Sequence, residues 1–130
     1  MNRSTPLDDA QYVSLRSYRK NGSAADTPVW IAPLDGKLMV FTLDDSYKVK
    51  RIARNPAVQL ARCDARGGNL GEWRNGHCIA VARGSEQERR AYDAFNRKYG
   101  LIMRVGTLFS TLVGRVRKRL VLEVTLDGNA

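Results

Sequence analysis

The sequence is poor in metal-binding side chains. It contains one histidine, His77, and two cysteines, Cys63 and Cys78. A structural zinc site takes about four ligands in paired local spacing, whereas these three residues are scattered and leave such a set incomplete. His77 and Cys78 are also neighbours in an expected strand, where successive side chains point to opposite faces. The sequence therefore predicts no metal site, and thiols that are buried instead of ligating.

Long hydrophobic runs are lacking too. No window approaches the ~20 consecutive apolar residues that cross a bilayer. The segment Met1–Gln11 is too polar and too short to resemble a signal peptide. Because the two cysteines lie inside expected strands, we expect a reducing, cytoplasmic compartment.

Catalytic arrangements of side chains are equally scarce. With a single histidine, the sequence offers no Ser/His/Asp set that its spacing supports. Its aspartates lie mostly at expected caps and turns, which are their usual structural positions. We therefore predict no catalytic side chain.

What the sequence has in excess is positive charge. Its 22 basic and 13 acidic residues give a formal net charge of +9, which attracts anions such as phosphorylated cofactors, nucleic acid or acidic lipid. With 130 residues, of which 43% are hydrophobic, the chain suits one domain, residues 1–130, with one ordinary core.

Alternating apolar residues and turn signals predict an all-antiparallel β architecture. Asn21-Gly22 and Asp35-Gly36 favour tight hairpin turns. The six expected strands are Gln11–Arg19, Thr27–Ala32, Lys37–Thr42, Ala57–Cys63, His77–Arg83 and Arg117–Leu126. Strands in this mostly sequential order, interrupted by helices, predict a mainly β fold, a six-stranded antiparallel barrel that is closed or partly closed.

A short basic helix is expected between the third and fourth strands. Asp45 or Ser46 can cap its start, and Pro56 ends it because the residue before a proline avoids the helical region. At 100° per residue, its side chains separate into two faces. The apolar face holds Val49, Ile52 and Ala53, and the cationic residues Lys48, Lys50, Arg51 and Arg54 spread over the other.

A second helix is expected at Ser85, where Ser85 and Glu88 have the spacing of a capping box. Its apolar stripe consists of Ala91, Tyr92, Phe95 and Tyr99, and Gly100 suits its end. The segment Leu101–Val113 fits a helical period as well, although two glycines weaken the pattern.

The basic helix and the neighbouring hairpin together suggest a ligand. Cations beside the free N–H groups of a helix start suit a phosphate, and the strand surface of Thr27–Ile31 and Phe41–Thr42 suits an aromatic ring. A phosphate next to a ring indicates a nucleotide-like cofactor.

Four motifs in this order resemble the pyridoxamine-phosphate-oxidase-like, FMN-binding split-barrel family, particularly its flavin or deazaflavin (coenzyme F420) oxidoreductase branch. They are YVSLRSYRKNG, DTPVWIAPLDGKLMVFT, SYKVKRIARNPAVQLARCDARG and GEWRNG. The resemblance covers roughly Gln11–Ala82 and implies the FMN-binding type of six-stranded split β-barrel.

The resemblance also implies a site. The ring and ribityl chain would be lined by Thr27, Pro28, Val29 and Trp30, with Phe41 and Thr42 at the matching place in the third strand. Lys48 matches the family's phosphate-binding lysine, and Lys50 and Arg51 fall in the adjoining basic positions. The family forms homodimers with the cofactor in the groove between subunits, which implies a two-chain site.

The activity implied is hydride transfer between coenzyme F420 or FMN and a small organic substrate. FMN-dependent oxidases carry a basic residue at the head of the second strand, where this chain has Thr27-Pro28. This departure favours the deazaflavin branch without deciding the cofactor.

Three alternatives remain open at this point. Arginine and lysine mixed with tyrosine in SLRSYRKNG and RVRKR could bind nucleic acid, although no RRM, KH or helix-turn-helix signature accompanies them. The segment Leu101–Val116, flanked by arginines, could touch a membrane surface. A haem-binding split barrel is the third, with His77 as its candidate axial ligand.

Overall fold

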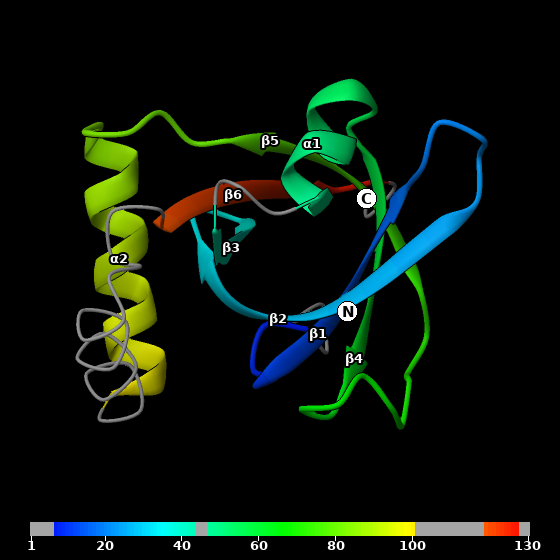
Figure 1. Ribbon diagram of the computed structural model, residues 1–130. Helices are drawn as coiled ribbons and strands as arrows, with labels where there is room; N and C mark the ends of the chain where they lie inside the picture. Colours follow the sequence, from blue (N-terminus) through cyan, green and yellow to red (C-terminus); the bar gives the residue numbers. More distant parts are fainter. Residues whose placement is uncertain (1–6, 44–46, 101–118, 128–130) are drawn as a thin grey trace, which may run out of the picture.

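The structure, a computed structural model, describes residues 7–43, 47–100 and 119–127. These residues form six strands and two helices (Figure 1). In chain order they are β1 (Tyr12–Tyr18), β2 (Ala24–Leu34), β3 (Lys37–Leu43), α1 (Tyr47–Arg54), β4 (Ala57–Cys63), β5 (Arg74–Ala80), α2 (Glu86–Tyr99) and β6 (Arg119–Leu126).

The six strands close into a barrel. Their order is β1-β2-β3-β6-β5-β4, and every neighbouring pair is antiparallel. The predicted hairpin turns are confirmed: Gly22 has φ 88°, and the two-residue turn between β2 and β3 holds Asp35 at 55° and Gly36 at 79°. Positive φ at both central residues matches the right-handed twist of the flanking strands. The expected mainly β fold, a six-stranded antiparallel barrel, is confirmed.

Strand β2 changes partners along its length. Its first part, Ala24–Val29, pairs with β1, whereas Trp30–Leu34 pairs with β3. Strand β3 continues past this point, and its last residues, Thr42 and Leu43, pair only with β6. The barrel is therefore split between the first half of β2 and the end of β3, where α1 follows along the chain.

Helix α1 covers one end of the barrel. Its Ile52 is only 3% exposed and lies in the interior cluster with strand residues such as Leu15, Val40 and Leu122. Val49 packs against the same cluster, so the predicted apolar face of this helix is confirmed. Burying an isoleucine side chain stabilises the fold by about 1.5–3 kcal/mol, which holds the helix to the barrel. The predicted caps, Asp45 and Ser46, lie outside the described residues.

Helix α2 covers the outer face of the barrel at β2 and β3 (Figure 1). Ser85 caps it by accepting a hydrogen bond from Glu88 N at 3.1 Å, and the Glu88 carboxylate accepts one from Gly84 N at 2.8 Å. Gly100 ends the helix with φ 54°. The helix buries its stripe in a second apolar cluster, together with Ala32, Leu34, Met39, Val81 and Val121. The predicted start and end are confirmed, and Leu101–Val113 lies outside the described residues.

The fifth strand was placed too late in the sequence. We predicted His77–Arg83, whereas β5 runs over Arg74–Ala80. Its register with both neighbours sets these bounds, since Arg74 pairs with Leu60 of β4 and Ala80 with Leu122 of β6. Arg74-Asn75-Gly76 has a low intrinsic β preference, so the sequence favoured the apolar residues that follow.

Neither of the two helices that the structure describes has the length and apolar character needed to cross a membrane.

Candidate functional site

Two cations of α1 reach the split end of the barrel. Lys48 Nζ donates to Thr42 Oγ1 at 3.0 Å, and Arg51 Nε donates to Ser17 Oγ at 2.7 Å. Both hydroxyls are buried: Ser17 is fully inaccessible and Thr42 is 8% exposed. Because the two cations are three residues apart, they lie on one flank of the helix, and their head groups are held on strands β1 and β3. We call Lys48 and Arg51 the cation pair.

Within the described part of the chain, the hydrogen-bond partners of the cation pair are neutral hydroxyls. Among residues 7–43, 47–100 and 119–127, no carboxylate forms an ion pair with Lys48 or Arg51. Burial, and then the charge of Arg51, lowers the pKa of Lys48. Burial, followed by the charges of Arg19 and Arg54, lowers the pKa of Arg51, which nevertheless stays protonated at neutral pH. These positive charges repel one another in a partly desolvated environment. An anion bound between them would therefore stabilise the folded protein.

The first half of β2 borders the same opening. Ala25 is paired with Ser17 of β1, and Thr27 is two residues further on the same face. Thr27 is half-buried, Pro28 is exposed and Val29 is 6% exposed within the interior cluster. Val29 can therefore offer a ligand only its backbone, whereas the side chains of Thr27 and Pro28 remain accessible.

Trp30 and Phe41 lie apart from the cation pair, on the outer face of the barrel. They are paired across β2 and β3, and both pack against α2. Trp30 stacks on Tyr99 with a centroid distance of 4.4 Å and an interplanar angle of 9°. Phe41 makes an edge contact with Tyr92 at 6.0 Å. Both rings remain partly exposed, so they can contact a ligand only from outside the barrel.

Lys50 is not part of the cation pair. Its side chain is exposed, and its Nζ lies 5.3 Å from the ring centroid of Tyr47, itself 75% exposed. The structure thus brings together Thr27, Thr42, Lys48 and Arg51 around the split end, and places Trp30, Phe41 and Lys50 elsewhere.

Sequence reasoning missed Ser17, the hydroxyl that holds Arg51. Val13, Leu15 and Ser17 alternate on the inner face of β1, and Ser17 is the polar member of that row. A buried polar residue in an inward row indicates a partner, and this signal could have singled Ser17 out.

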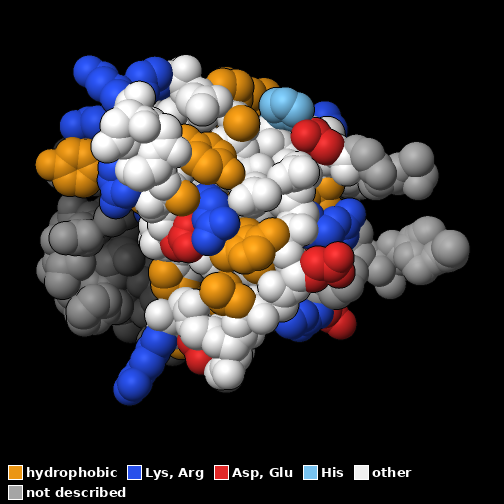
Figure 2. Space-filling view, turned by 90° about the vertical axis from the view of Figure 1, so that its right-hand side faces the viewer, with side chains coloured by type: hydrophobic (Ala, Val, Ile, Leu, Met, Phe, Trp, Pro, Cys, Tyr) orange, Lys and Arg blue, Asp and Glu red, His pale blue; other side chains and the backbone are white. Residues whose placement is uncertain are grey.

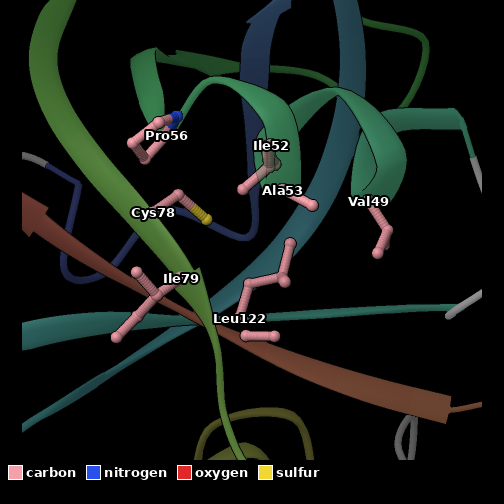
Figure 3. Close-up of a pocket in the computed structure, with 8 residues that line it drawn as sticks. Val49, Ile52, Ala53, Pro56, Cys78, Ile79 and Leu122 are labelled. Carbon is pink, nitrogen blue, oxygen red and sulfur yellow. The ribbon is translucent and has the colours of Figure 1, made fainter.

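The other flank of α1 borders an apolar cavity of about 310 Å³ (Figure 3). Val49, Ile52 and Ala53 project from α1 toward Leu122 of β6, and β5 closes the side. The remaining lining residues are Pro56, Cys78, Ile79 and Ala80. Burial raises the pKa of the Cys78 thiol to about 12, so this cavity offers apolar contact and no reactive group.

The described residues hold no cluster of metal ligands. His77 and Cys78 point to opposite sides of β5: the imidazole is 61% exposed, whereas Cys78 is 1% exposed. His77 Nδ1 lies 2.8 Å from Asp127 Oδ1.

Basic side chains also gather on the molecular surface. Figure 2 shows Lys and Arg side chains collected at the upper left of one face, whereas the acidic side chains of that face lie elsewhere on it.

Comparison with known proteins identifies the fold. No family model and no curated protein matches the sequence. Among solved structures, HutZ, the heme storage protein from Vibrio cholerae, is 10% identical with a TM-score of 0.72 over 95% of this chain and 86% of that one. A putative pyridoxamine 5'-phosphate oxidase from Listeria innocua is 13% identical with a TM-score of 0.59, covering 93% of this chain and 87% of that one. An F420 reductase is 16% identical with a TM-score of 0.60, covering 94% and 90%.

At these identities the likeness is one of fold. The chain has the split-barrel fold of pyridoxamine-phosphate-oxidase-like proteins, as the sequence motifs indicated.

Proposed function

We propose that this protein is an oxidoreductase that binds coenzyme F420 or FMN and passes a hydride between the cofactor and a small organic substrate. The observation that carries the proposal is the cation pair, in which Lys48 and Arg51 reach buried hydroxyls at the split end of the barrel without an acidic partner among the described residues. Such a pair suits a phosphate.

The residues present fit the phosphate of either cofactor. Two charge-assisted hydrogen bonds from Lys48 and Arg51 would each contribute about 1.5–3 kcal/mol, and the lowered pKa of Lys48 would rise again on binding an anion. Thr27 borders the same opening and would contact the ribityl chain, whereas the exposed Pro28 would contact it from the other face of β2. Trp30 and Phe41 would contact the ring from the outer face.

The proposed hydride transfer requires no catalytic side chain from the protein. A bound flavin or deazaflavin supplies the hydride chemistry itself, and the chain contributes binding, orientation and electrostatics. This agrees with a sequence in which no catalytic side chain is predicted.

The remaining parts of the proposal concern assembly and location. We propose a homodimer with the cofactor in the groove between subunits, because the cation pair and the ring-contacting residues of one chain lie on different faces of the barrel. We propose a cytoplasmic location because both cysteines are free thiols.

Equilibrium dialysis with visible spectra, followed by native mass spectrometry, tests the proposal. The protein is expected to retain coenzyme F420 or FMN with micromolar affinity or better. Replacing Lys48 or Arg51 by Gln should weaken retention about tenfold to a hundredfold, since each change removes one charge-assisted contact. The matched control Arg97→Gln removes one exposed charge from α2 and should leave affinity unchanged. A wild-type protein that retains neither cofactor would refute the proposal.

Haem binding is the second candidate, and the geometry of His77 favours it. Asp127 Oδ1 lies 2.8 Å from Nδ1 of His77, which orients the ring and would leave Nε2 to hold a haem iron. A titration with haemin, followed by the Soret band, separates the candidates. Loss of the band in His77→Ala, with cofactor retention unchanged, would assign haem to this residue.

A further inference from the structure

The chain contains two Asn-Gly pairs, Asn21-Gly22 and Asn75-Gly76, and the fold places them in different environments. The first occupies the turn between β1 and β2, and the second lies inside β5. An Asn-Gly pair is chemically labile, because glycine has no side chain to keep its backbone nitrogen away from the asparagine side-chain carbonyl. The surroundings of each pair decide whether the two groups can react.

The side-chain carbonyl of Asn21 is held by two donors. Its Oδ1 accepts from the backbone N–H of Ser23 at 2.9 Å and from the Ser23 hydroxyl at 2.7 Å. Donors at a carbonyl oxygen stabilise the negative charge that develops there when a nucleophile attacks the carbon. These two bonds therefore activate Cγ of Asn21 toward the backbone nitrogen of Gly22.

The backbone around Gly22 has room to move. Its φ is 88°, and a methyl group on its Cα would meet no atom within 4 Å. Its N–H donates to the Arg19 carbonyl at 2.9 Å, at the tip of the hairpin, and such bonds open at much lower cost than those of central strands. The preceding Arg19 and Lys20 are positively charged, which favours loss of the proton from this amide.

The second pair is fixed in the sheet. Gly76 is paired on both sides, with Val58 of β4 and Leu126 of β6. A methyl group on its Cα would lie 2.8 Å from the Thr125 carbonyl oxygen, so the backbone of β6 packs directly against it. Ring closure requires rotation of the backbone between the asparagine and the glycine, and the two neighbouring strands prevent that rotation.

We propose that Asn21 is a site of spontaneous deamidation in the folded protein, and that the fold favours it over Asn75. The backbone nitrogen of Gly22 gives its proton to solvent and forms a bond to Cγ of Asn21. The bond from Cγ to the side-chain nitrogen then breaks, and this nitrogen takes up a proton and leaves as ammonia. Water opens the resulting succinimide at either carbonyl carbon, which gives a normal aspartyl or an isoaspartyl linkage.

The modification places a carboxylate beside Arg19. The Ser23 hydroxyl that donates to Asn21 also accepts from Arg19 Nη1 at 3.1 Å, so only this hydroxyl separates the new charge from the guanidinium. Arg19 Nη1 also donates to the Ala24 carbonyl at 2.8 Å, at the start of β2. An isoaspartyl linkage adds a further carbon to the main chain of the turn, so the hairpin changes in backbone length as well as in charge.

Peptide mapping by mass spectrometry, on protein stored at mildly alkaline pH and body temperature, tests the inference. In the folded protein Asn21 should be converted at least about tenfold faster than Asn75. In the same protein unfolded in urea, the two rates should agree within about threefold, because only the fold separates the two pairs. No conversion of Asn21 in the folded protein, or equal rates at the two sites, would overturn the inference.

Substitutions of Ser23 test the activation of the carbonyl. Ser23→Ala removes the hydroxyl donor and should slow conversion of Asn21 about threefold or more, whereas Ser23→Thr keeps a hydroxyl and should retain the rate within about twofold. Circular dichroism checks that both variants remain folded. An unchanged rate in Ser23→Ala would contradict the role of this hydroxyl. The measured quantity is a mass, so the result is independent of cofactor binding and of the proposed function.

Discussion

Two partly buried lysines, Lys48 on α1 and Lys98 on α2, show how the two ends of this molecule differ. Lys98 donates to two backbone carbonyls, those of Asp8 at 2.9 Å and Ile31 at 2.8 Å. Lys48 donates to one hydroxyl, that of Thr42. Burial lowers the pKa of both, but Asp9 and Asp8 counteract this shift at Lys98, whereas Arg51 adds to it at Lys48.

The difference shows a structural role for Lys98 and agrees with the binding role that we propose for Lys48. Lys98 and its neighbour Tyr99 fasten α2 to the barrel: the Tyr99 hydroxyl shares its one proton between the carbonyls of Gln11 at 2.8 Å and Ile31 at 2.9 Å, and it accepts from Ile31 N at 3.1 Å. A polar group satisfied within the fold contributes to stability. A charge left among like charges weakens the fold slightly and serves a ligand instead.

The largest expected effect is a loss of stability when the packing of α2 against the barrel is disrupted. Phe95→Ala removes the largest fully buried side chain of the described residues and should lower the free energy of unfolding by about 3–5 kcal/mol. Urea titration of the variant measures this loss. Affinity for inorganic phosphate should stay within about threefold at temperatures where the variant is folded, because the cation pair lies on another element, whereas the ring-contacting Phe41 packs on Phe95 with a centroid distance of 5.6 Å. An affinity loss without a stability loss would reverse the roles assigned to the two helices.

Matched substitutions of the two lysines come next. Lys98→Met removes the lysine donor of the Asp8 carbonyl and one of the two side-chain donors near the Ile31 carbonyl, and should cost about 1–3 kcal/mol. Lys48→Met removes a repelled charge, so unfolding in urea should change by less than about 0.5 kcal/mol. Cofactor retention should fall about tenfold to a hundredfold in Lys48→Met only. Equal stability losses in the two variants would show that Lys48 is structural.

The Tyr99 hydroxyl gives the α2 side an alkaline limit. Burial raises the pKa of Tyr99 to about 12, whereas a tyrosine in the unfolded chain ionises near 10. The unfolded state therefore loses its proton first, and the stability that Tyr99 contributes is complete below pH 10 and declines as the pH rises toward 12. Between pH 9 and 11 the loss should be roughly 1 kcal/mol.

Tyr99→Phe is the control for this alkaline loss, because it keeps the ring and removes the hydroxyl. The difference in unfolding free energy between wild type and variant should shrink over this pH range. A constant difference would mean that the hydroxyl is not the group that titrates.

The smallest expected effect is the pH dependence of anion binding by Lys48. Its lowered pKa means that the ammonium loses its proton at a lower pH than an ordinary lysine, so anion binding should weaken before pH 10.5. The rise in melting temperature caused by saturating inorganic phosphate should therefore decrease between pH 8 and 10. Lys48→Gln should show a smaller rise that stays level over this range. If the phosphate-induced rise in the melting temperature of the wild type also stays constant over this pH range, Lys48 does not bind the anion.

Local patterns predicted most of the fold. The hairpin at Asp35-Gly36, the Ser85 cap and the bounds of β4 follow from residues within a few positions of each other, because turn geometry and capping are local. The bounds of β5 were wrong because two neighbouring strands fix its register. Of the residues predicted for the site, Lys48, Arg51 and Thr42 come together, and the place of Trp30 against α2 was not foreseen. That these residues bind a cofactor stays a prediction.

The sequence by itself determined which segments become strands and helices, and that α1 has a cationic and an apolar side, since these depend on near neighbours in the chain. Only the tertiary structure decided which cations lack an acidic partner. Arg51 meets Ser17 across 34 positions of sequence, and Arg90 meets Asp35 across 55. A charge is satisfied or left for a ligand by the groups that folding brings beside it, and the spacing of residues along a chain does not record that.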